Sequence, residues 1–403
     1  MARGDGPLGG MKVLDLTHVM AGPTCALMLA DMGADVIKVE KVPGGDDTRR
    51  AVPPKIGDEA AAFLVMNRGK RSIAVNLKTK EGQDAVRRMA LEADVLLENY
   101  RQGTLAKLGL AYEDLKKENP KLVWCSISGF GQTGPYAERG GFDLIAQGMS
   151  GLMHITGEGP GRPPCKVGAP ITDITAGLLA AMGVSAAYAH AQKTGEGQIV
   201  DTSLFEAGII HTYWQSAIAF ATGVSPAAMG SAHPLNAPYQ AFETSDGWIT
   251  CGAANQRTWG RLLDALDNPQ IADDPRFQEN TGRMEHRHEL EDILAPIFKE
   301  KSSAEWLAIF DEVGLPAGPV LDINQMHADP HAIARDMIID VPHKALGSAK
   351  ALGMPVKFTG TPVKTDQGAP VYGQHTREVL AEYGFSADEI QAMIDGGAVL
   401  TDD

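Results

Sequence analysis

The chain has 403 residues, with 36 Lys and Arg against 51 Asp and Glu, so its formal net charge at pH 7 is −15. Hydrophobic residues make up 44% and charged residues 22%, a composition that builds a large core and excludes a disordered chain. The acidic balance excludes nucleic acid and an anionic membrane surface as partners, because both require clustered Lys and Arg. At this length we expect two or three domains.

The cysteines and the N-terminus indicate a reduced, cytoplasmic compartment. Cys25, Cys125, Cys165 and Cys251 are far apart and form no CxxC pair, so the sequence predicts neither a metal site nor a disulfide framework. The first ten residues lack the apolar core of a signal peptide. A long weakly polar run over residues 171–191 contains several polar side chains, which favours a buried helix over a membrane span.

Strand and helix patterns alternate over the first two hundred residues. Residues 11–16 and 34–40 are typical of buried strands, and residues 22–32 between them have the apolar spacing of a helix. Further strands are expected over residues 71–76, 93–98 and 122–127, with a helix over residues 81–92. This order predicts an α/β fold with a Rossmann-like, doubly wound sheet.

Later segments follow a different pattern. Residues 1–221 are expected to form the first part of the large domain, and the Pro/Gly-rich residues 222–238 a linker. Residues 239–317 are predicted to form a small α+β domain that opens with a hairpin around residues 245–247. A helix is expected to begin near Asp201, residues 355–358 have a strand pattern, and the last segment, residues 318–403, ends in an acidic amphipathic helix.

The turn after the first strand, residues 17–23 (THVMAGP), lies at the carboxyl edge of the predicted sheet. Doubly wound folds bind ligands at this edge, and the helix N-terminus near Gly22 suits an anion. Glu40 ends the second strand, the position at which dinucleotide-binding folds have a carboxylate that binds the ribose. Because the GxGxxG fingerprint is absent, an NAD-dependent dehydrogenase is only a distant alternative.

Residues 38–107 carry 14 Lys and Arg against 10 Asp and Glu, a net charge of +4, so the rest of the chain carries −19. The basic side chains around and after the third strand pattern form either a solvated rim or a binding site for a phosphorylated ligand. The local charge favours the binding site. These side chains are Arg68, Lys70, Arg71, Lys78, Lys80, Arg101 and Lys107.

Asp173 opens the long apolar helix, in residues 168–177 (GAPITDITAG). One interpretation is that Thr172 or Asp173 only caps this helix. The other is a carboxylate nucleophile, kept ionised by the helix dipole and by free N–H groups, which attacks a thioester or phosphoryl group.

Motifs over nearly the whole chain resemble the class III CoA-transferases, the family of formyl-CoA transferase, carnitine CoA-transferase and the bile-acid-inducible F type, which also includes the α-methylacyl-CoA racemases. The matching segments are residues 10–17 (GMKVLDLT), 21–23 (AGP), 33–40 (GADVIKVE), 45–49 (GDDTR), 67–72 (NRGKRS), 98–100 (ENY), 128–135 (SGFGQTGP), 194–198 (TGEGQ) and 373–376 (GQHT).

The resemblance implies a fold and a reaction. The N- and C-terminal segments would share the Rossmann-like large domain, and two chains would interlock as a homodimer. Asp173 would attack the acyl-CoA thioester to give an aspartyl-acyl anhydride and then an aspartyl-CoA thioester, from which CoA passes to an acceptor carboxylate. Oxyanion donors are expected in the backbone around Met20 and Ala21. The resemblance implies no permanently bound cofactor and no metal, since coenzyme A enters as a substrate.

The resemblance also implies the positions that contact CoA. Met20 and Ala21 would lie by the thioester. Lys41 and Lys107 stand where the family has arginines, and they keep the positive charge but lose the paired N–H donors of a guanidinium. The remaining expected contacts are Val75, Asn76, Leu77 and Lys78 at the adenine, Asn99, Tyr100 and Arg101 at the pantetheine and phosphates, and Gly141 and Asp143.

Two departures bear on the reaction. The racemases have a histidine in a Gly-His-Asp motif where this chain has Phe142, which disfavours an acyl-CoA racemase or epimerase. The tetraglycine loop of formyl-CoA transferase is absent, and residues 150–157 (SGLMHITG) and 238–242 (PYQAF) look closer to the succinyl-CoA-dependent dicarboxylate transferases, of which succinate–hydroxymethylglutarate CoA-transferase is an example. We expect an enzyme that transfers CoA from an acyl-CoA such as succinyl-CoA to a carboxylic or dicarboxylic acid. A CoA-binding protein without catalysis is the other alternative.

Overall fold

The computed structural model describes residues 6–362 and 366–402, and the chain divides into two compact units. The first unit comprises Met1–Gly151, Val167–His211 and Pro330–Asp403, and the second comprises Leu152–Lys166 and Thr212–Asp329. Each unit has a sheet and a hydrophobic core of its own.

The first unit is built on a seven-stranded sheet in the order β14-β5-β2-β1-β6-β7-β8. Six strands are parallel, and the edge strand β14 (Val399–Leu400) pairs antiparallel with β5. The chain adds β2 and β5 on one side of β1, then β6, β7 and β8 on the other, so the direction of winding reverses between β1 and β6. Doubly wound folds bind their ligands at this switch point. The parallel strands are β1 (Lys12–Asp15), β2 (Asp35–Lys41), β5 (Lys70–Val75), β6 (Val95–Glu98), β7 (Val123–Ser128) and β8 (Ile199–Ser203).

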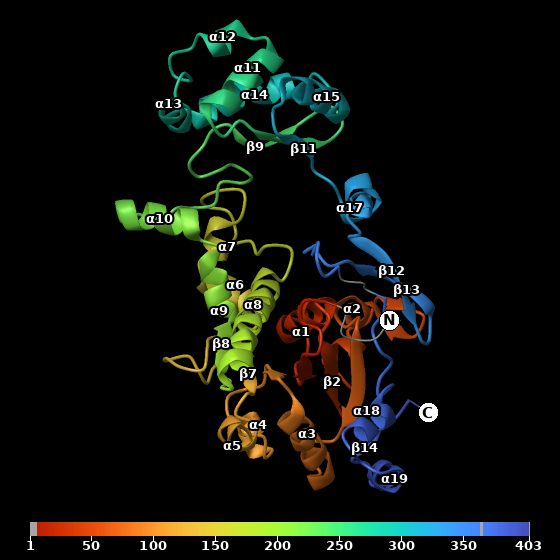
Figure 1. Ribbon diagram of the computed structural model, residues 1–403. Helices are drawn as coiled ribbons and strands as arrows, with labels where there is room; N and C mark the ends of the chain where they lie inside the picture. The colour runs from red at the N-terminus through yellow and green to blue at the C-terminus, as the bar shows by residue number, and fades with distance from the viewer. Residues whose placement is uncertain (1–5, 363–365, 403) are drawn as a thin grey trace. The chain divides into compact units, whose positions relative to one another are not determined.

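Helices cover both faces of this sheet because successive strand residues are apolar on both sides. Val13 and Val36 pack on the face covered by α1 (Ala21–Asp31) and α8 (Ile171–Thr194). Leu14 and Ile37 pack on the opposite face, under α3, α5, α18 and α19 (Figure 1). The helices of this second face are α3 (Lys80–Glu92), α5 (Tyr112–Glu118), α18 (Thr376–Glu382) and α19 (Ala387–Asp395).

Shorter elements complete the first unit around the sheet edges. They are η1 (Asp47–Arg50), β3 (Lys55–Ile56), β4 (Glu59–Ala60), α2 (Ala61–Met66), α4 (Thr104–Lys107), α6 (Asp143–Met149), α9 (Leu204–Ile210), α17 (Pro330–Ala334), β12 (Ile338–His343) and β13 (Gly347–Leu352). The long helix α8 packs against α1, α9, β7 and β8. By length and composition α8 is apolar enough to cross a membrane, but here it serves as a core helix of the first unit.

The second unit has a three-stranded antiparallel sheet in the order β11-β10-β9, with helices packed on it. Its core is aromatic, with Phe242, Trp259, Phe298 and Trp306 buried together. Its elements are α7 (Leu152–Ile155), α10 (Tyr213–Thr222), β9 (Tyr239–Glu243), β10 (Trp248–Gly252), α11 (Gln256–Leu266), α12 (Pro269–Ala272), α13 (Asn280–Glu285), α14 (Arg287–Phe298), α15 (Ser303–Val313), β11 (Ala317–Pro319) and α16 (Ile323–Ala328).

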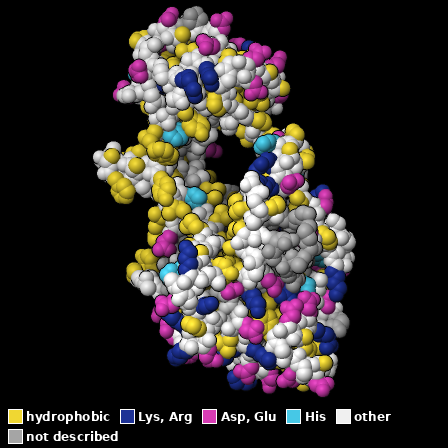
Figure 2. All heavy atoms as spheres, in the orientation of Figure 1, with side chains coloured by type: hydrophobic (Ala, Val, Ile, Leu, Met, Phe, Trp, Pro, Cys, Tyr) yellow, Lys and Arg dark blue, Asp and Glu magenta, His cyan; other side chains and the backbone are white. Residues whose placement is uncertain are grey.

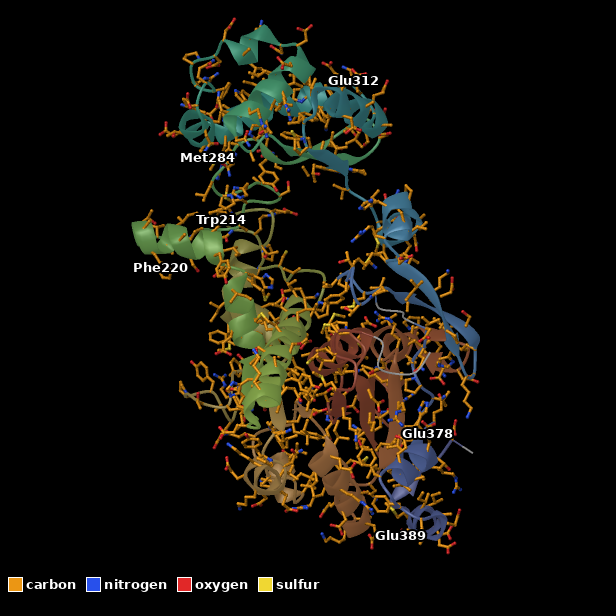
Figure 3. The ribbon with its side chains drawn as sticks, viewed as in Figure 1. Trp214, Phe220, Met284, Glu312, Glu378 and Glu389 are labelled. Carbon is orange, nitrogen blue, oxygen red and sulfur yellow. The ribbon has the colours of Figure 1, made fainter. Side chains whose placement is uncertain are left out.

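Helix α10 is unusual because it is apolar and has no buried residue. Trp214 and Phe220 project from it, with exposed fractions of 57% and 88% (Figure 3). Hydrophobic side chains gather over this helix on the face shown in Figure 2. Such a surface is characteristic of a protein–protein contact.

The predicted α/β class and the large parallel sheet are confirmed, and the early strands lie within two residues of their predicted bounds. The hairpin around residues 245–247 is confirmed by the pairing of β9 with β10. The second unit is larger than the predicted small domain, because it also takes in α10, α16 and residues 152–166.

Three local predictions were wrong. The helix expected near Asp201 begins only at Leu204, because residues 199–203 pair with β7 and Ser203 caps the helix. Residues 355–358 form no strand, and the strands of this region are β12 and β13. The acidic helix is present as α19, but the chain does not end in it, since β14 follows and adds to the sheet. In the first and third cases, sheet pairing with a distant segment overrides the local pattern.

Candidate active site

The β1–α1 loop and the end of β6 meet at the switch point of the sheet. The backbone N–H of His18 donates to Oδ1 of Asn99 at 3.0 Å, and Nδ2 of Asn99 donates to the carbonyl oxygen of His18 at 2.8 Å. The His18 ring lies edge-on to Tyr100, with ring centroids 4.6 Å apart. Burial, which is the largest cause, and the charge of Lys38 lower the pKa of His18. These contacts fasten the loop to the edge where ligands bind.

Val19 in this loop has a left-handed backbone, with φ of +69°. A β-branched residue in this region carries strain of about 1–3 kcal/mol, and such strain is common at functional sites. Met20 and Ala21 follow directly and begin α1, whose first intrahelical bond runs from the Thr24 N–H to the Met20 carbonyl. In the part of the chain that the structure describes, no side chain caps this helix, so its first N–H groups are open to an anion.

Asp173 lies in the first turn of α8, beside the N-terminal turn of α1. A Cβ at Gly177, one turn further along the same face of α8, would lie 2.5 Å from the Ala21 carbonyl oxygen. The two helices therefore touch backbone to backbone at this point, and Asp173 projects next to the contact. Among residues 6–362 and 366–402, no hydrogen bond or ion pair engages its carboxylate. The residue is half-buried.

Asp143, at the start of α6, rather than Asp173, caps α8. Its Oδ1 accepts hydrogen bonds from the Thr172 N–H at 3.0 Å and from Thr172 Oγ1 at 2.8 Å. Its Oδ2 accepts a bond from Nε2 of Gln147 at 2.7 Å. The interpretation that Thr172 or Asp173 only caps the helix is therefore wrong, since a third residue does so.

Asp173 is harder to ionise than the sequence predicts. Burial, followed by the negative charge of Asp143, raises the pKa of Asp173 to about 7. The expectation that the helix dipole keeps it ionised is wrong, because Asp143 already occupies the Thr172 N–H and adds a like charge. Strongly shifted pKa values are typical of catalytic groups, so the raised pKa of Asp173 favours a catalytic role.

The expected CoA contacts gather at the carboxyl edge of the sheet. Lys41 ends β2, and its Nζ lies 2.6 Å from Oδ1 of Asp47. Val75 ends β5, and residues 76–78 form a turn in which Asn76 bonds to the backbone of Ala398 and Gly397. Asn99, Tyr100 and Arg101 follow β6, and Lys107 ends α4.

The basic side chains near this edge of the sheet differ in exposure and in ion pairing. Within the described residues, Lys78, Arg101 and Lys107 are exposed and form no ion pair, so their charges are free for a phosphate. Arg68, Lys70 and Arg71 are almost fully buried in ion pairs with Asp31, Asp15 and Asp35. These three side chains are neither a solvated rim nor a phosphate site, and that part of the prediction was wrong. Sequence reasoning missed this because burial depends on tertiary packing.

The predicted contacts Gly141 and Asp143 belong to the loop that supports α8. A Cβ at Gly141 would lie 2.6 Å from the Cα of Gly129, so two backbones pass each other without a side chain between them. Their contact with CoA stays a prediction, as does that of the other residues. Among the residues described, no three His, Cys, Asp or Glu side chains are placed to hold a metal ion.

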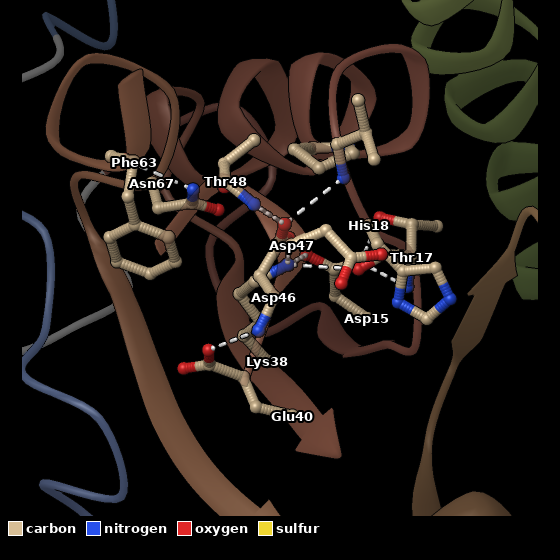
Figure 4. Close-up of polar contacts among 12 residues, drawn as sticks. Asp15, Thr17, His18, Lys38, Glu40, Asp46, Asp47, Thr48, Phe63 and Asn67 are labelled. Carbon is tan, nitrogen blue, oxygen red and sulfur yellow. Dashed lines mark hydrogen bonds and ion pairs between the residues drawn. The ribbon is translucent and has the colours of Figure 1, made fainter. Parts of the chain in front are cut away.

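Sequence reasoning also missed a group of buried charges below the β1–α1 loop. Lys38 of β2 and Asp46 are fully buried and form an ion pair at 2.9 Å (Figure 4). Both lie in segments quoted for the resemblance, residues 33–40 and 45–49. The only further signal was that Lys38 interrupts the apolar residues of its strand.

Several known proteins are similar to this chain over nearly its whole length. The model of CoA-transferase family III matches residues 8–376. A succinate–glutarate CoA-transferase of Agrobacterium fabrum is 41% identical over 93% of this chain and 95% of its own length. A succinyl-CoA–D-citramalate CoA-transferase of Chloroflexus aurantiacus is 37% identical over 98% of both chains. A crystal structure of a CAIB/BAIF family protein from Brucella suis has a TM-score of 0.84 and 40% identity, covering 94% of this chain and all of that one.

The family match spans the strands, the β1–α1 loop and Asp173 together, and the named relatives transfer CoA. The chain belongs to CoA-transferase family III and is a CoA-transferase.

Proposed function

We propose that this enzyme moves CoA from succinyl-CoA to a second dicarboxylic acid, with Asp173 as the nucleophile. The observation that carries the proposal is the placement of Asp173 beside the open N-terminus of α1, half-buried and without a partner among the described residues. Relatives that match nearly their full length are named for succinyl-CoA or succinate and a dicarboxylic acid, which supports this substrate class.

The reaction proceeds through two covalent states of Asp173. Its carboxylate attacks the thioester carbonyl of succinyl-CoA, and the CoA thiolate leaves as a mixed anhydride forms. The thiolate then attacks the aspartyl carbonyl, which releases succinate and leaves an aspartyl-CoA thioester. The acceptor carboxylate repeats the two steps in reverse, so the acceptor leaves as its CoA thioester and Asp173 is regenerated.

The surroundings of Asp173 suit these steps. Each attack places negative charge on a carbonyl oxygen, and the N–H groups that begin α1 are arranged to stabilise it. The exposed cations Lys78 and Arg101 lie on the strand-end loops and Lys107 ends α4, where they would bind the phosphates of CoA. The pantetheine would lie between them, along Asn99 and Tyr100.

The test is the covalent intermediate. Wild-type enzyme incubated with succinyl-CoA is expected to gain a CoA adduct on Asp173, detected by peptide mass spectrometry and removed by hydroxylamine. Asp173→Asn is expected to lose both the adduct and CoA transfer, by about 10³-fold or more. Asp94→Asn is the matched control, because Asp94 is another partly buried carboxylate with a raised pKa and lies at the opposite edge of the sheet.

Other outcomes would favour other functions. Full transfer by Asp173→Asn would contradict nucleophilic catalysis at this residue, and CoA binding without transfer by the wild type would indicate a binding protein. Exchange of the substrate α-proton with deuterated water, without an acceptor acid, would indicate a racemase, which Phe142 disfavours.

We also propose that two chains interlock as a homodimer in the cytoplasm. In the first unit the apolar side chains Phe142, Leu178 and Met182 are exposed, with fractions of 76%, 44% and 66%. In the second unit the apolar helix α10 has no buried residue. Apolar surface of this extent on each unit supports an extensive contact with a second copy.

A further inference from the structure

The β1–α1 loop rests on buried charges that are not among the expected CoA contacts. Lys38 is fully buried, and its Nζ forms an ion pair with Oδ2 of Asp46 at 2.9 Å. The same ammonium donates to the carbonyl oxygen of Thr17 at 2.9 Å and lies 4.0 Å from Asp15 (Figure 4). Asp15 in turn pairs with Lys70 at 3.2 Å. Buried charges are costly unless they are paired, so this group holds one defined arrangement.

Asp46 connects these charges to the strained residue of the loop. Its Oδ1 accepts hydrogen bonds from the Val19 N–H at 3.2 Å, from the Thr48 N–H at 2.9 Å and from Thr48 Oγ1 at 2.8 Å. The carboxylate is therefore fixed from both sides, by Lys38 at one oxygen and by Thr48 at the other. It holds Val19 at a φ of +69°, and Met20 and Ala21 follow in the next two positions.

We propose that Lys38 and Asp46 are positioning residues, whose buried pair holds the β1–α1 loop so that the Met20 and Ala21 N–H groups face the reacting carbonyl. This inference rests on the proposed function, in which those N–H groups stabilise the developing oxyanion. Lys38 fixes the loop before the strained residue, at Thr17, and Asp46 fixes it at Val19. Together they determine the direction in which α1 begins.

This group of buried side chains has no net charge, so it positions the loop without adding charge to the active site. Asp15 and Asp46 balance Lys38 and Lys70 within the same contacts. Burial opposes ionisation of Asp46, but Lys38 and the bonds from Thr48 outweigh it and hold the pKa of Asp46 well below its usual range. Burial likewise opposes the charge of Lys38, and Asp15 and Asp46 outweigh it. Both members of the Lys38–Asp46 pair thus remain charged at neutral pH.

The variants Asp46→Asn and Lys38→Met remove one charge each with little change of shape. Asp31→Asn is the matched control, because Asp31 forms an equally buried ion pair with Arg68 at the other end of α1. Hydrogen–deuterium exchange of the full chain is expected to show the amides of residues 19–21 exchanging at least about tenfold faster in the two variants. The control is expected to leave them unchanged although it lowers the melting temperature.

The kinetic readout separates positioning from general destabilisation. In Asp46→Asn, kcat for CoA transfer is expected to fall about 10- to 100-fold, while KM for succinyl-CoA stays within about threefold. Binding is retained because the expected contacts with the adenine, the pantetheine and the phosphates at residues 75–78 and 99–101 lie at the ends of β5 and β6, away from the substituted pair. Asp31→Asn is expected to keep the wild-type kcat.

Thr48→Val serves as a milder second variant if Asp46→Asn does not fold, since it removes the Oγ1 bond and leaves the ion pair. It is expected to give smaller changes in the same direction. Unchanged exchange at residues 19–21, or a loss of kcat equal to that of the control, would overturn the positioning role. A wild-type enzyme that transfers no CoA would overturn the proposed function alone, because the exchange measurement does not depend on activity.

Discussion

At the scale of single residues, Asp173 combines two properties that oppose each other. A nucleophile must be ionised, yet burial and the charge of Asp143 raise the pKa of Asp173 to about 7. A more basic carboxylate is a stronger nucleophile, and near neutral pH enough of it is ionised to react. The environment of Asp173 thus makes the carboxylate a stronger nucleophile, but it lowers the stability of the folded state.

The first prediction from this pKa concerns rate. We expect kcat/KM for CoA transfer to fall tenfold per pH unit below about pH 7 and to level off above it, because only ionised Asp173 attacks. Asp143→Asn is expected to move the midpoint to lower pH, since it removes the nearby negative charge while burial remains. A wild-type midpoint near pH 4 in the pH–rate profile would contradict this environment.

The second prediction concerns stability. The pKa of Asp173 is higher in the folded state than the ordinary value of 3.8. As the pH rises from 3.8 to about 7, ionisation of Asp173 therefore lowers the free energy of unfolding, and the full loss is reached above about pH 7. Asp173→Asn removes this loss. It is expected to raise the free energy of unfolding by about 1–3 kcal/mol at pH 8 and by less at pH 5, as measured by denaturant titration. An equal or larger gain at pH 5 would show that ionisation is not the cause.

At the scale of elements, the contact between α1 and α8 brings the nucleophile to the loop. Gly177 makes this contact possible, because a Cβ there would lie 2.5 Å from the Ala21 carbonyl oxygen and 2.7 Å from Thr24 Cβ. Both neighbours belong to a buried helix and cannot move away cheaply.

Gly177→Ala is therefore expected to separate the two helices. We expect a loss of about 1–3 kcal/mol in the free energy of unfolding, despite the better helix propensity of alanine, and a lower kcat. Gly260→Ala is the control, because nothing lies within 4 Å of a Cβ at this position in α11. It should be neutral or slightly stabilising, and equal effects of the two substitutions would contradict close packing at Gly177.

At the scale of the whole molecule, the first unit is assembled from three separate parts of the chain. The last of these supplies α18, α19 and β14, and Leu380 and Val399 are fully buried in its core. The exposed apolar side chains of both units remain available for a second copy.

Met182→Glu on α8 and Phe220→Glu on α10 test that contact. Analytical ultracentrifugation is expected to show a dimer for the wild type and a shift toward monomer for each variant, because a buried carboxylate without a partner destabilises an apolar interface. Lys121→Glu, an exposed charge reversal outside these apolar surfaces, is expected to leave the dimer unchanged. A monomeric wild type would contradict the proposed assembly.

The sequence by itself determined the α/β class, the early strands, the hairpin and the family, because local apolar spacing and contiguous motifs are properties of short segments. Only the tertiary structure decided which charges are free. Arg68, Lys70 and Arg71 are buried in ion pairs, whereas Lys78, Arg101 and Lys107 are exposed. It also decided the pKa of Asp173 and the cap of α8, since both depend on Asp143, 30 residues earlier in the chain. Net charge and motif spacing contain no such information, because burial and ionisation depend on neighbours brought together by folding.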